Sequence, residues 1–147
     1  MTTLPPSTGS TIVATSDDEI RSAFPVMRQL RPHLEEAAFV ATVRAAERLG
    51  LRIVLHVDDG RVVAVAGFRL LDQLKSGLVL YVDDLVTDEA ERSKRYGDAL
   101  LDWLVAHAKS QQCVAFELDS GVHRFAAHRF YFRKRMHISA YHFMMEL

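Results

Sequence analysis

A basic turn in the second half of the chain has the composition of a phosphate site. Arg92, Lys94 and Arg95 lie within four residues of one another, directly before a predicted apolar helix. The first N–H groups of a helix have no partner within it, and the helix dipole favours negative charge at that end. Such a turn is well suited to bind phosphate. The alternative is an ordinary strand-to-helix connection with solvated basic residues, and the residues alone do not separate the two.

Two adjacent carboxylates, Asp83 and Asp84, precede this turn in a predicted strand. Alternation along a strand predicts that they point to opposite faces, so that one reaches a substrate and the other supports structure. A lysine-like amine with a pKa of about 10.4 is almost fully charged at pH 7, and a carboxylate is a suitable acceptor for its proton. Capping or ion pairing explains either residue equally well.

A third candidate is Tyr131, which lies between Phe130 and Phe132 in a predicted helix. A tyrosine hydroxyl can donate a proton to a leaving group. A core tyrosine packed among aromatic neighbours is the commoner explanation of such a position.

In order and spacing, these segments resemble the GNAT acetyltransferases. That family has a Q/R-x-x-G-x-G/A signature after its fourth strand, in which Arg92 matches the first position and Gly97 the last. Ala99-Leu100-Leu101 follow as in the family, and Ala127 to Tyr131 match its A-x-x-F/L-Y segment. The resemblance covers most of the chain.

The resemblance implies acetyl transfer from acetyl-CoA to a primary amine by direct attack, without a metal or a covalent intermediate. Tyr131 would be the general acid, and Asp83 (or, as second choice, Asp84) the base; Asp83 would also contact the acceptor. Phe24 and Gln29 are further candidate acceptor contacts. Acetyl-CoA would contact the backbone of one strand end, the basic turn and one further arginine: Leu85, Val86, Thr87, Arg92, Ser93, Lys94, Arg95, Tyr96, Gly97, Asp98 and Arg124.

Two positions depart from the family pattern. Arg124 stands where the family often has Asn, and Arg95 replaces the middle glycine of the signature. Glycine there permits positive φ, which costs any other residue on the order of 1–2 kcal/mol. The guanidinium could offset this cost by pairing with a phosphate. Arg95 also supports an alternative function, a non-catalytic acyl-CoA-binding or regulatory module with the same fold.

The elements that must position these residues alternate between strands and helices. Ser16 and Glu19 form a capping-box pattern, Pro25 should kink or divide the first helix, and Asp59-Gly60 predicts a hairpin turn. The predicted strands are 11–15, 51–58, 61–71, 77–87, 113–118 and 138–146, and the predicted helices after the divided one are 32–49, 94–111 and 122–133. This order predicts an α+β fold, with a central mixed, twisted sheet flanked by about four helices.

Helix 32–49 is expected to bury Leu34, the alanines at 37, 38, 41 and 45, and Leu49, with Gly50 at its C-terminal end. Residues 1–10 read as a flexible tail and residues 11–147 as a single domain.

Composition excludes several classes of protein. The 147 residues carry a net charge of −1, which argues against binding nucleic acid by bulk electrostatics. Seven histidines lack a metal-site spacing, and the single Cys113 opens an apolar strand, so we expect neither a metal nor a thiol nucleophile. With no apolar run of membrane-spanning length, a cytoplasmic location is the default. We expect a small-molecule or peptide amine as acceptor; a homodimer is left open.

Overall fold

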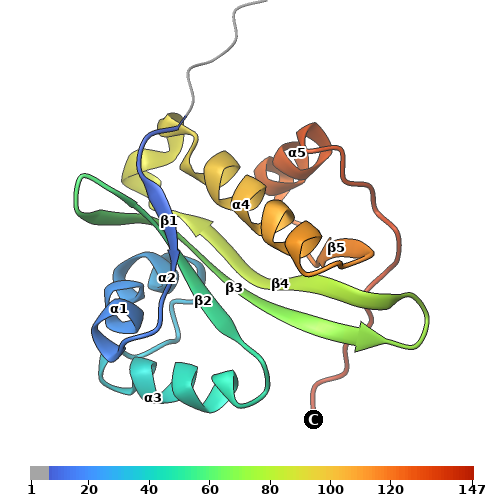
Figure 1. The fold of residues 1–147 in the computed structure, drawn as a ribbon, viewed down its shortest axis with the longest axis horizontal. Coiled ribbons are helices and arrows are strands. Elements are labelled where there is room, and N and C mark those ends of the chain that lie inside the picture. Colours follow the sequence, from blue (N-terminus) through green and yellow to red (C-terminus); the bar gives the residue numbers. More distant parts are fainter. Residues whose placement is uncertain (1–6) are drawn as a thin grey trace, which may run out of the picture. The chain divides into compact units, whose positions relative to one another are not determined.

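The computed structural model describes residues 7–147, apart from the side chain of Ser93. These residues form five strands, five α-helices and one 3-10 helix (Figure 1). In chain order the elements are β1 (Ser10–Val13), α1 (Asp17–Ser22), α2 (Phe24–Leu30), α3 (Glu36–Glu47), β2 (Arg52–Asp58), β3 (Arg61–Gln73), β4 (Gly77–Thr87), η1 (Glu89–Lys94), α4 (Tyr96–Ser110), β5 (Ala115–Leu118) and α5 (Phe125–Arg133). The chain divides into two compact units between Glu117 and Leu118.

The larger unit is built on a sheet with the strand order β1-β2-β3-β4-β5. Strands β1 to β4 pair antiparallel with their neighbours, whereas β5 follows the crossover helix α4, which makes the sheet mixed. The β2–β3 hairpin turns at Asp59 and Gly60, both at positive φ (51° and 72°). The α+β fold with a mixed sheet and the Asp59-Gly60 hairpin are therefore confirmed.

Helices cover both faces of this sheet (Figure 1). Buried side chains of α1 to α3, including Phe24 and Phe39, form one core with Ile53 and Val65 of the sheet. On the other face, Leu100 and Leu104 of α4 are fully buried.

The first helical region begins and divides as predicted. Glu19 N donates to Ser16 Oγ (3.1 Å) and Ser16 N donates to Glu19 Oε1 (3.0 Å), which completes the capping box. Hydrogen bonds from the backbone of Ser16 and Thr15 lower the pKa of Glu19. Helices α1 and α2 meet at Ala23, and Pro25 lies in the first turn of α2, where its missing N–H costs nothing.

The predicted buried stripe of the second helix is wrong except at Leu34, which precedes α3 and packs partly buried against the core. Helix α3 buries Phe39 and Val43, while the alanines at 37, 38, 41 and 45 are exposed and Leu49 is 77% exposed. The larger side chains decide the orientation, because burying a phenylalanine and a valine removes more apolar surface from water than burying alanines.

The smaller unit contains α5, and the strand predicted over residues 138–146 is absent from it: none of the described residues 137–147 is in a strand. A strand exists only through backbone pairing with a neighbour, and the described backbone of this segment forms no such pair. Within this unit His128 Nε2 lies 2.8 Å from Gly121 O, and His142 Nδ1 lies 3.1 Å from Asp119 Oδ2.

The predicted tail lies partly outside the described residues, which begin at residue 7. Thr8 Oγ1 donates to Asp58 Oδ2 (2.7 Å), so this part of the predicted tail contacts the sheet. The assignment of one domain to residues 11–147 stays a prediction. In the described part of the chain, no helix combines the length and apolar character needed to cross a bilayer.

Candidate functional site

A β-bulge lies at the two carboxylates of β4. The β3–β4 register passes from the pair Gly67–Asp84 to the pair Phe68–Val82, so Asp83 is the extra residue on β4. Bulges of this kind redirect side chains and are common beside active sites. A Cβ on Gly67 would lie 2.9 Å from Asp84 Oδ2, so that any other residue at this position would force this carboxylate to shift.

The bulge overturns the prediction that the two carboxylates point to opposite faces. Asp84 is paired with Gly67, and Asp83 Oδ2 accepts from Arg69 Nε (2.8 Å), which lies two residues further along β3. Gly67 and Arg69 share one face of β3 by alternation, so both carboxylates are reached from that face. Strict alternation fails at the extra residue of a bulge.

Two arginines bind these carboxylates. Arg69 also donates to Leu49 O, at the end of the α3 region (3.2 Å). Arg31, directly after α2, donates from Nε to Asp84 Oδ1 (2.8 Å) and from Nη2 to Asp83 O (3.2 Å). The second oxygen of Asp83, Oδ1, is buried and has no hydrogen-bond partner among the described residues. Because a buried acceptor without a partner is costly, Asp83 Oδ1 is a natural position for a bound water or a substrate N–H group.

The basic turn has the strained backbone that the sequence predicts. Arg95 lies between η1 and α4 with φ 61° and ψ 27°, the left-handed region that glycine occupies at little cost. Arg95 is also the N-cap of α4, and its side chain makes no capping hydrogen bond. The first N–H groups of α4, at Tyr96, Gly97 and Asp98, are therefore not capped by that residue, as a phosphate site requires.

The basic side chains of this turn have different environments. Lys94 Nζ lies 2.6 Å from Glu91 Oε2, and Arg61 Nη2 lies 2.7 Å from Glu91 Oε1. These hydrogen bonds lower the pKa of Glu91, a buried carboxylate. Arg95 Nε is 3.5 Å from Asp98 Oδ2, whereas Arg92 is exposed and forms no ion pair with the described residues. Lys94 is thus engaged within the protein, and Arg92 and Arg95 are the cations more accessible to a phosphate.

A network of polar side chains fixes the start of α4 against the sheet. Tyr96, the first residue of α4, donates to Asp58 Oδ2 (2.5 Å), and this hydrogen bond raises the pKa of Tyr96. Thr8 donates to the same carboxylate oxygen, and its carbonyl contacts Nε2 of buried His56 (2.8 Å). Tyr96 and His56 are in aromatic contact, with ring centroids 5.5 Å apart. Tyr96 therefore positions the turn.

The end of β4 extends past its short neighbour. Strand β5 has four residues against eleven in β4, and Val114 N donates to Leu78 O at the beginning of β4. Residues Leu85 to Thr87 pair with β3 on one side and lie about seven residues beyond that contact. Four residues of β5 cannot span this distance, so the other edge of Leu85–Thr87 has backbone groups available to an extended ligand.

Tyr131 and Arg124 lie together in the smaller unit. Burial raises the pKa of the Tyr131 hydroxyl, and Arg124, which hydrogen-bonds to that hydroxyl, opposes the rise. Arg124 is the N-cap of α5. The hydroxyl therefore stays protonated at neutral pH, which is the state required of a proton donor.

The two predicted acceptor contacts have structural partners. Phe24 is buried against Phe39, with ring centroids 5.3 Å apart. Gln29 accepts from Glu89 N (2.9 Å) and donates to Asp88 Oδ1 (3.2 Å), which links α2 to the segment after β4. Both residues are placed to shape the region around β4. Ser93 belongs to η1, but its side chain is outside the described part of the structure.

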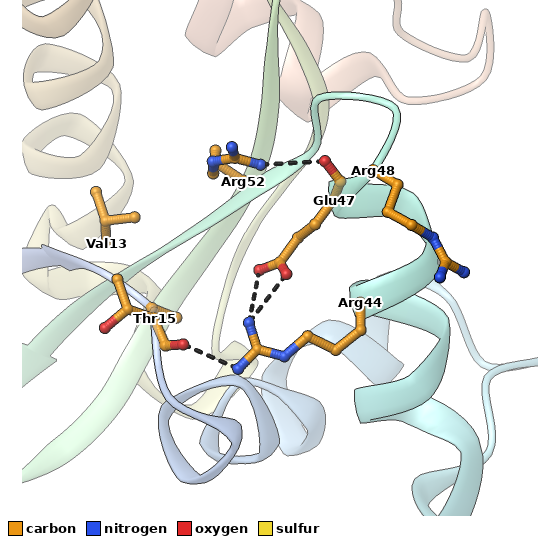
Figure 2. A pocket seen from close by; sticks show the side chains of 7 residues that line it. Val13, Thr15, Arg44, Glu47, Arg48 and Arg52 are labelled. Carbon is orange, nitrogen blue, oxygen red and sulfur yellow. Dashed lines mark hydrogen bonds and ion pairs between the residues drawn. The ribbon is translucent and has the colours of Figure 1, made fainter.

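A separate cavity of about 330 Å³ lies between β1 and the end of α3. Figure 2 shows the side chains that line it. Arg44 donates to both carboxylate oxygens of Glu47 and to Thr15 O, and Arg52 donates to Glu47 O. These groups satisfy one another and link α3 to the chain before α1. None of the predicted site residues lines this cavity.

Sequence reasoning missed Arg31, Arg69 and the Tyr96 network. The short β3–β4 turn sets the register from Gln73–Gly77 onward and places Arg69 opposite Tyr81, diagonal to Asp83. A prediction of this register would therefore have indicated that Arg69 lies within reach of Asp83. Arg31 lies in a loop about fifty residues before Asp84, and no local sequence pattern indicates that the two residues form an ion pair.

Comparison with known proteins gives a consistent result. The model of the acetyltransferase (GNAT) family matches residues 17–137. The uncharacterized N-acetyltransferase YhdJ of Bacillus subtilis (strain 168) is 30% identical over 118 residues, which are 80% of this chain and 83% of YhdJ. A transcriptional regulator from Bacillus halodurans C-125 has the same fold, with a TM-score of 0.81 at 18% identity over 95% of this chain and 100% of that one. Ribosomal-protein-alanine N-acetyltransferase from Brucella melitensis biovar Abortus 2308 has a TM-score of 0.80 at 13% identity, over 94% and 99% of the two chains.

Proposed function

The chain belongs to the acetyltransferase (GNAT) family and is an N-acetyltransferase, and we propose that it transfers acetyl from acetyl-CoA to a primary amine by direct attack. The observation that carries this proposal is the carboxylate of Asp83 in the β4 bulge. Its Oδ2 is fixed by Arg69, and its buried Oδ1 has no hydrogen-bond partner among the described residues. An oriented carboxylate with one oxygen that lacks a hydrogen bond can act as a general base, and because that oxygen is buried, a water would connect it to the amine.

The donor is proposed to bind along the end of β4 and at the start of α4. The pyrophosphate of acetyl-CoA would accept hydrogen bonds from the N–H groups of Tyr96, Gly97 and Asp98, with Arg92 and Arg95 supplying positive charge. The backbone of Leu85, Val86 and Thr87 would pair with the extended pantetheine arm. An N–H group of this strand end would also polarise the thioester carbonyl and stabilise the oxyanion.

Two residues are proposed to move protons. Asp83, directly or through a water, first takes one proton from the ammonium group, which frees the nitrogen lone pair for attack, and passes that proton to solvent. The second proton, which the nitrogen loses after the C–N bond forms, leaves by the same route. When the C–S bond breaks, the Tyr131 hydroxyl gives its proton to the departing thiolate, whose ordinary pKa is about 8.5. Solvent then reprotonates Tyr131. Arg124, which contacts the same hydroxyl, would stabilise the tyrosinate formed in between.

The acceptor is proposed to be a cationic amine, on a small molecule or a peptide. Asp83 attracts an ammonium group, and Arg69 prevents Asp83 from turning away. Phe24 and Gln29 would act by positioning α2 beside this site, since the ring of Phe24 is buried and both polar atoms of the Gln29 amide are hydrogen-bonded.

Thiol release from acetyl-CoA in the presence of a panel of primary amines tests the proposal. Tyr131→Phe and Asp83→Asn should each lower kcat by roughly 10²-fold, because each removes one proton transfer, while binding of acetyl-CoA changes little. Asp72→Asn, on the exposed side of β3, is the matched control and should keep full turnover. Tight binding of acetyl-CoA without transfer to any amine would instead favour a non-catalytic acyl-CoA-binding module. Unchanged turnover in either variant would remove the role assigned to that residue.

A further inference from the structure

The four charged side chains at the β4 bulge form two ion pairs. Arg31 Nε lies 2.8 Å from Asp84 Oδ1, and Arg69 Nε lies 2.8 Å from Asp83 Oδ2. Two cations and two anions leave this cluster without net charge. An acceptor whose only charge is its ammonium group is attracted by the carboxylates and repelled by the arginines. Charge alone therefore gives the cluster little preference for a simple cationic amine.

Arg31 is held at the end of α2 by the local sequence. The following residue is Pro32, which disfavours a helical conformation at Arg31, and the backbone there has φ −122° and ψ 72°. Arg31 N still donates to Met27 O (2.9 Å), so α2 ends at this residue. From there the side chain donates from Nε to Asp84 Oδ1 (2.8 Å) and from Nη2 to Asp83 O (3.2 Å). Two hydrogen bonds to successive residues of β4 thus fix the orientation of the guanidinium.

Two groups of this cluster have no hydrogen-bond partner among the described residues. One is the buried Oδ1 of Asp83, an acceptor, and the other is Nη1 of Arg31, which carries only donor hydrogens. The side chain of Arg31 is also the most exposed of the four, at 43% against 27% for Arg69. Because the Arg31 guanidinium contacts the backbone carbonyl of Asp83 itself, one small molecule can reach both unpaired groups.

Given the acetyl transfer proposed for this site, we propose that the acceptor is an amine that also carries an anionic group, a carboxylate or a phosphate, and that Arg31 binds this anion. The ammonium group of such a molecule reaches Asp83 Oδ1 through a water, while its anionic group accepts from Nη1 of Arg31. A guanidinium that is already fixed on one side is well suited to this task. Its planar donors match carboxylate and phosphate oxygens, and little side-chain freedom is lost on binding.

An ion pair that only stabilises the fold is the alternative role of Arg31. In that role the arginine orients Asp84 and the bulge, and its loss impairs the reaction of every acceptor by the same factor. In the proposed role, the loss of Arg31 impairs acceptors that carry an anion more than acceptors that do not. A comparison of matched acceptors therefore separates the two roles.

Primary amines that differ in one anionic group provide this comparison: lysine and cadaverine, phenylalanine and 2-phenylethylamine, O-phosphoethanolamine and ethanolamine. In thiol release, the anionic member of each pair that reacts should have the higher kcat/KM, by roughly 10- to 100-fold, as expected for charge-assisted hydrogen bonds. Arg31→Gln should bring this ratio to about one, since glutamine carries no charge to pair with the anion. Arg21→Gln, at an exposed arginine of α1 that pairs with Asp18, is the matched control and should keep the ratio. Equal kcat/KM within the pairs, or an Arg31→Gln variant that impairs both members in parallel, would overturn the proposal.

An NMR titration of the wild type tests the anion site without turnover. The Nε–H signal of Arg31, identified by its absence from the spectrum of Arg31→Lys, should shift saturably with acetate or with inorganic phosphate. The anion that binds more tightly indicates which group the acceptor carries, and sodium chloride at the same ionic strength is the control. No saturable shift with either anion, or an equal shift with chloride, would refute the site even if no amine is acetylated. A saturable shift without turnover of any amine would support the anion site and count against the proposed acetyl transfer.

Discussion

Arg95 occupies a left-handed backbone conformation, φ 61° and ψ 27°, immediately before the first residue of α4. Within the protein, the contacts of the Arg95 side chain contribute little stability to offset the strain of this conformation. Its Nε lies 3.5 Å from Asp98 Oδ2, a loose contact between groups that are 40% and 18% exposed. An exposed ion pair of this kind contributes about 0–1 kcal/mol. Replacing Arg95 with glycine should therefore separate backbone strain from ligand binding.

The expected gain in stability follows from two opposing terms. Removing a side chain from left-handed backbone relieves about 1–2 kcal/mol. Glycine loses more conformational freedom on folding than other residues, which costs about 0.5–1 kcal/mol. Compared with Arg95→Ala, which also lacks the guanidinium but keeps the strain, Arg95→Gly should be more stable by roughly 0.5–1 kcal/mol. For a chain of this size each kcal/mol shifts Tm by about 2–4 °C.

Thermal and urea denaturation of the wild type, Arg95→Ala and Arg95→Gly measure this difference. Calorimetric titration with acetyl-CoA measures the other half of the prediction. Both variants should bind roughly tenfold more weakly than the wild type, because both lose the same charged contact to phosphate. Lowered stability and weakened binding in the alanine variant, set against recovered stability in the glycine variant, is the expected pattern.

Two outcomes would refute the reasoning on Arg95. If Arg95→Gly were less stable than Arg95→Ala, the left-handed backbone would not be a source of strain. If both variants bound acetyl-CoA as tightly as the wild type, the guanidinium would not contact phosphate, and Arg92 and the N–H groups of α4 would suffice.

Three further changes probe the elements around the site. Gly67→Ala should lower the free energy of unfolding by about 1–3 kcal/mol in urea denaturation, since its Cβ would lie 2.9 Å from Asp84 Oδ2; an equal cost in an Asp84→Ala background would exclude this clash as the cause. Tyr96→Phe should lower Tm and raise the Kd of acetyl-CoA in calorimetry, because the start of α4 is no longer fixed to Asp58; no change in either quantity would contradict that role. Glu19→Gln should destabilise the protein near pH 7, and the difference from the wild type should disappear as pH falls through the lowered pKa of Glu19, since the capping carboxylate contributes only while ionised; a difference that persists unchanged at pH 2 in denaturation experiments would contradict it.

Much of the fold could be predicted from local patterns. The capping box at Ser16 and Glu19, the division at Pro25 and the hairpin at Asp59-Gly60 are each set by a few neighbouring residues. The bounds of β4 and the buried stripe of α4 follow from the period of apolar residues. The positive φ of Arg95 was predictable because a position that the family fills with glycine has a conformational requirement.

The predictions that failed depend on contacts between distant residues. Helix α3 buries the face that carries its larger apolar side chains, Phe39 and Val43, which pack in one core with the sheet. The segment 138–147 has the alternation of a strand, but no pattern within one segment can supply the neighbour that a strand requires. In both cases the type of element or the presence of apolar residues was only part of the information, because the packing partner also decides the outcome.

The β4 bulge shows why the site is harder to predict than the fold. Strict alternation along β4 would separate Asp83 and Asp84, and only the extra residue opposite Gly67 and Phe68 brings both carboxylates to the arginines of one face. In a regular strand, one of the two carboxylates would point to the face of the sheet that α4 covers. That carboxylate would then not lie beside Arg31 and Arg69. The extra residue leaves Asp83 Oδ1 buried without a partner among the described residues, which is a cost to stability. A water or an acceptor N–H group that donates to Oδ1 would remove this cost, as the proposed role of Asp83 requires.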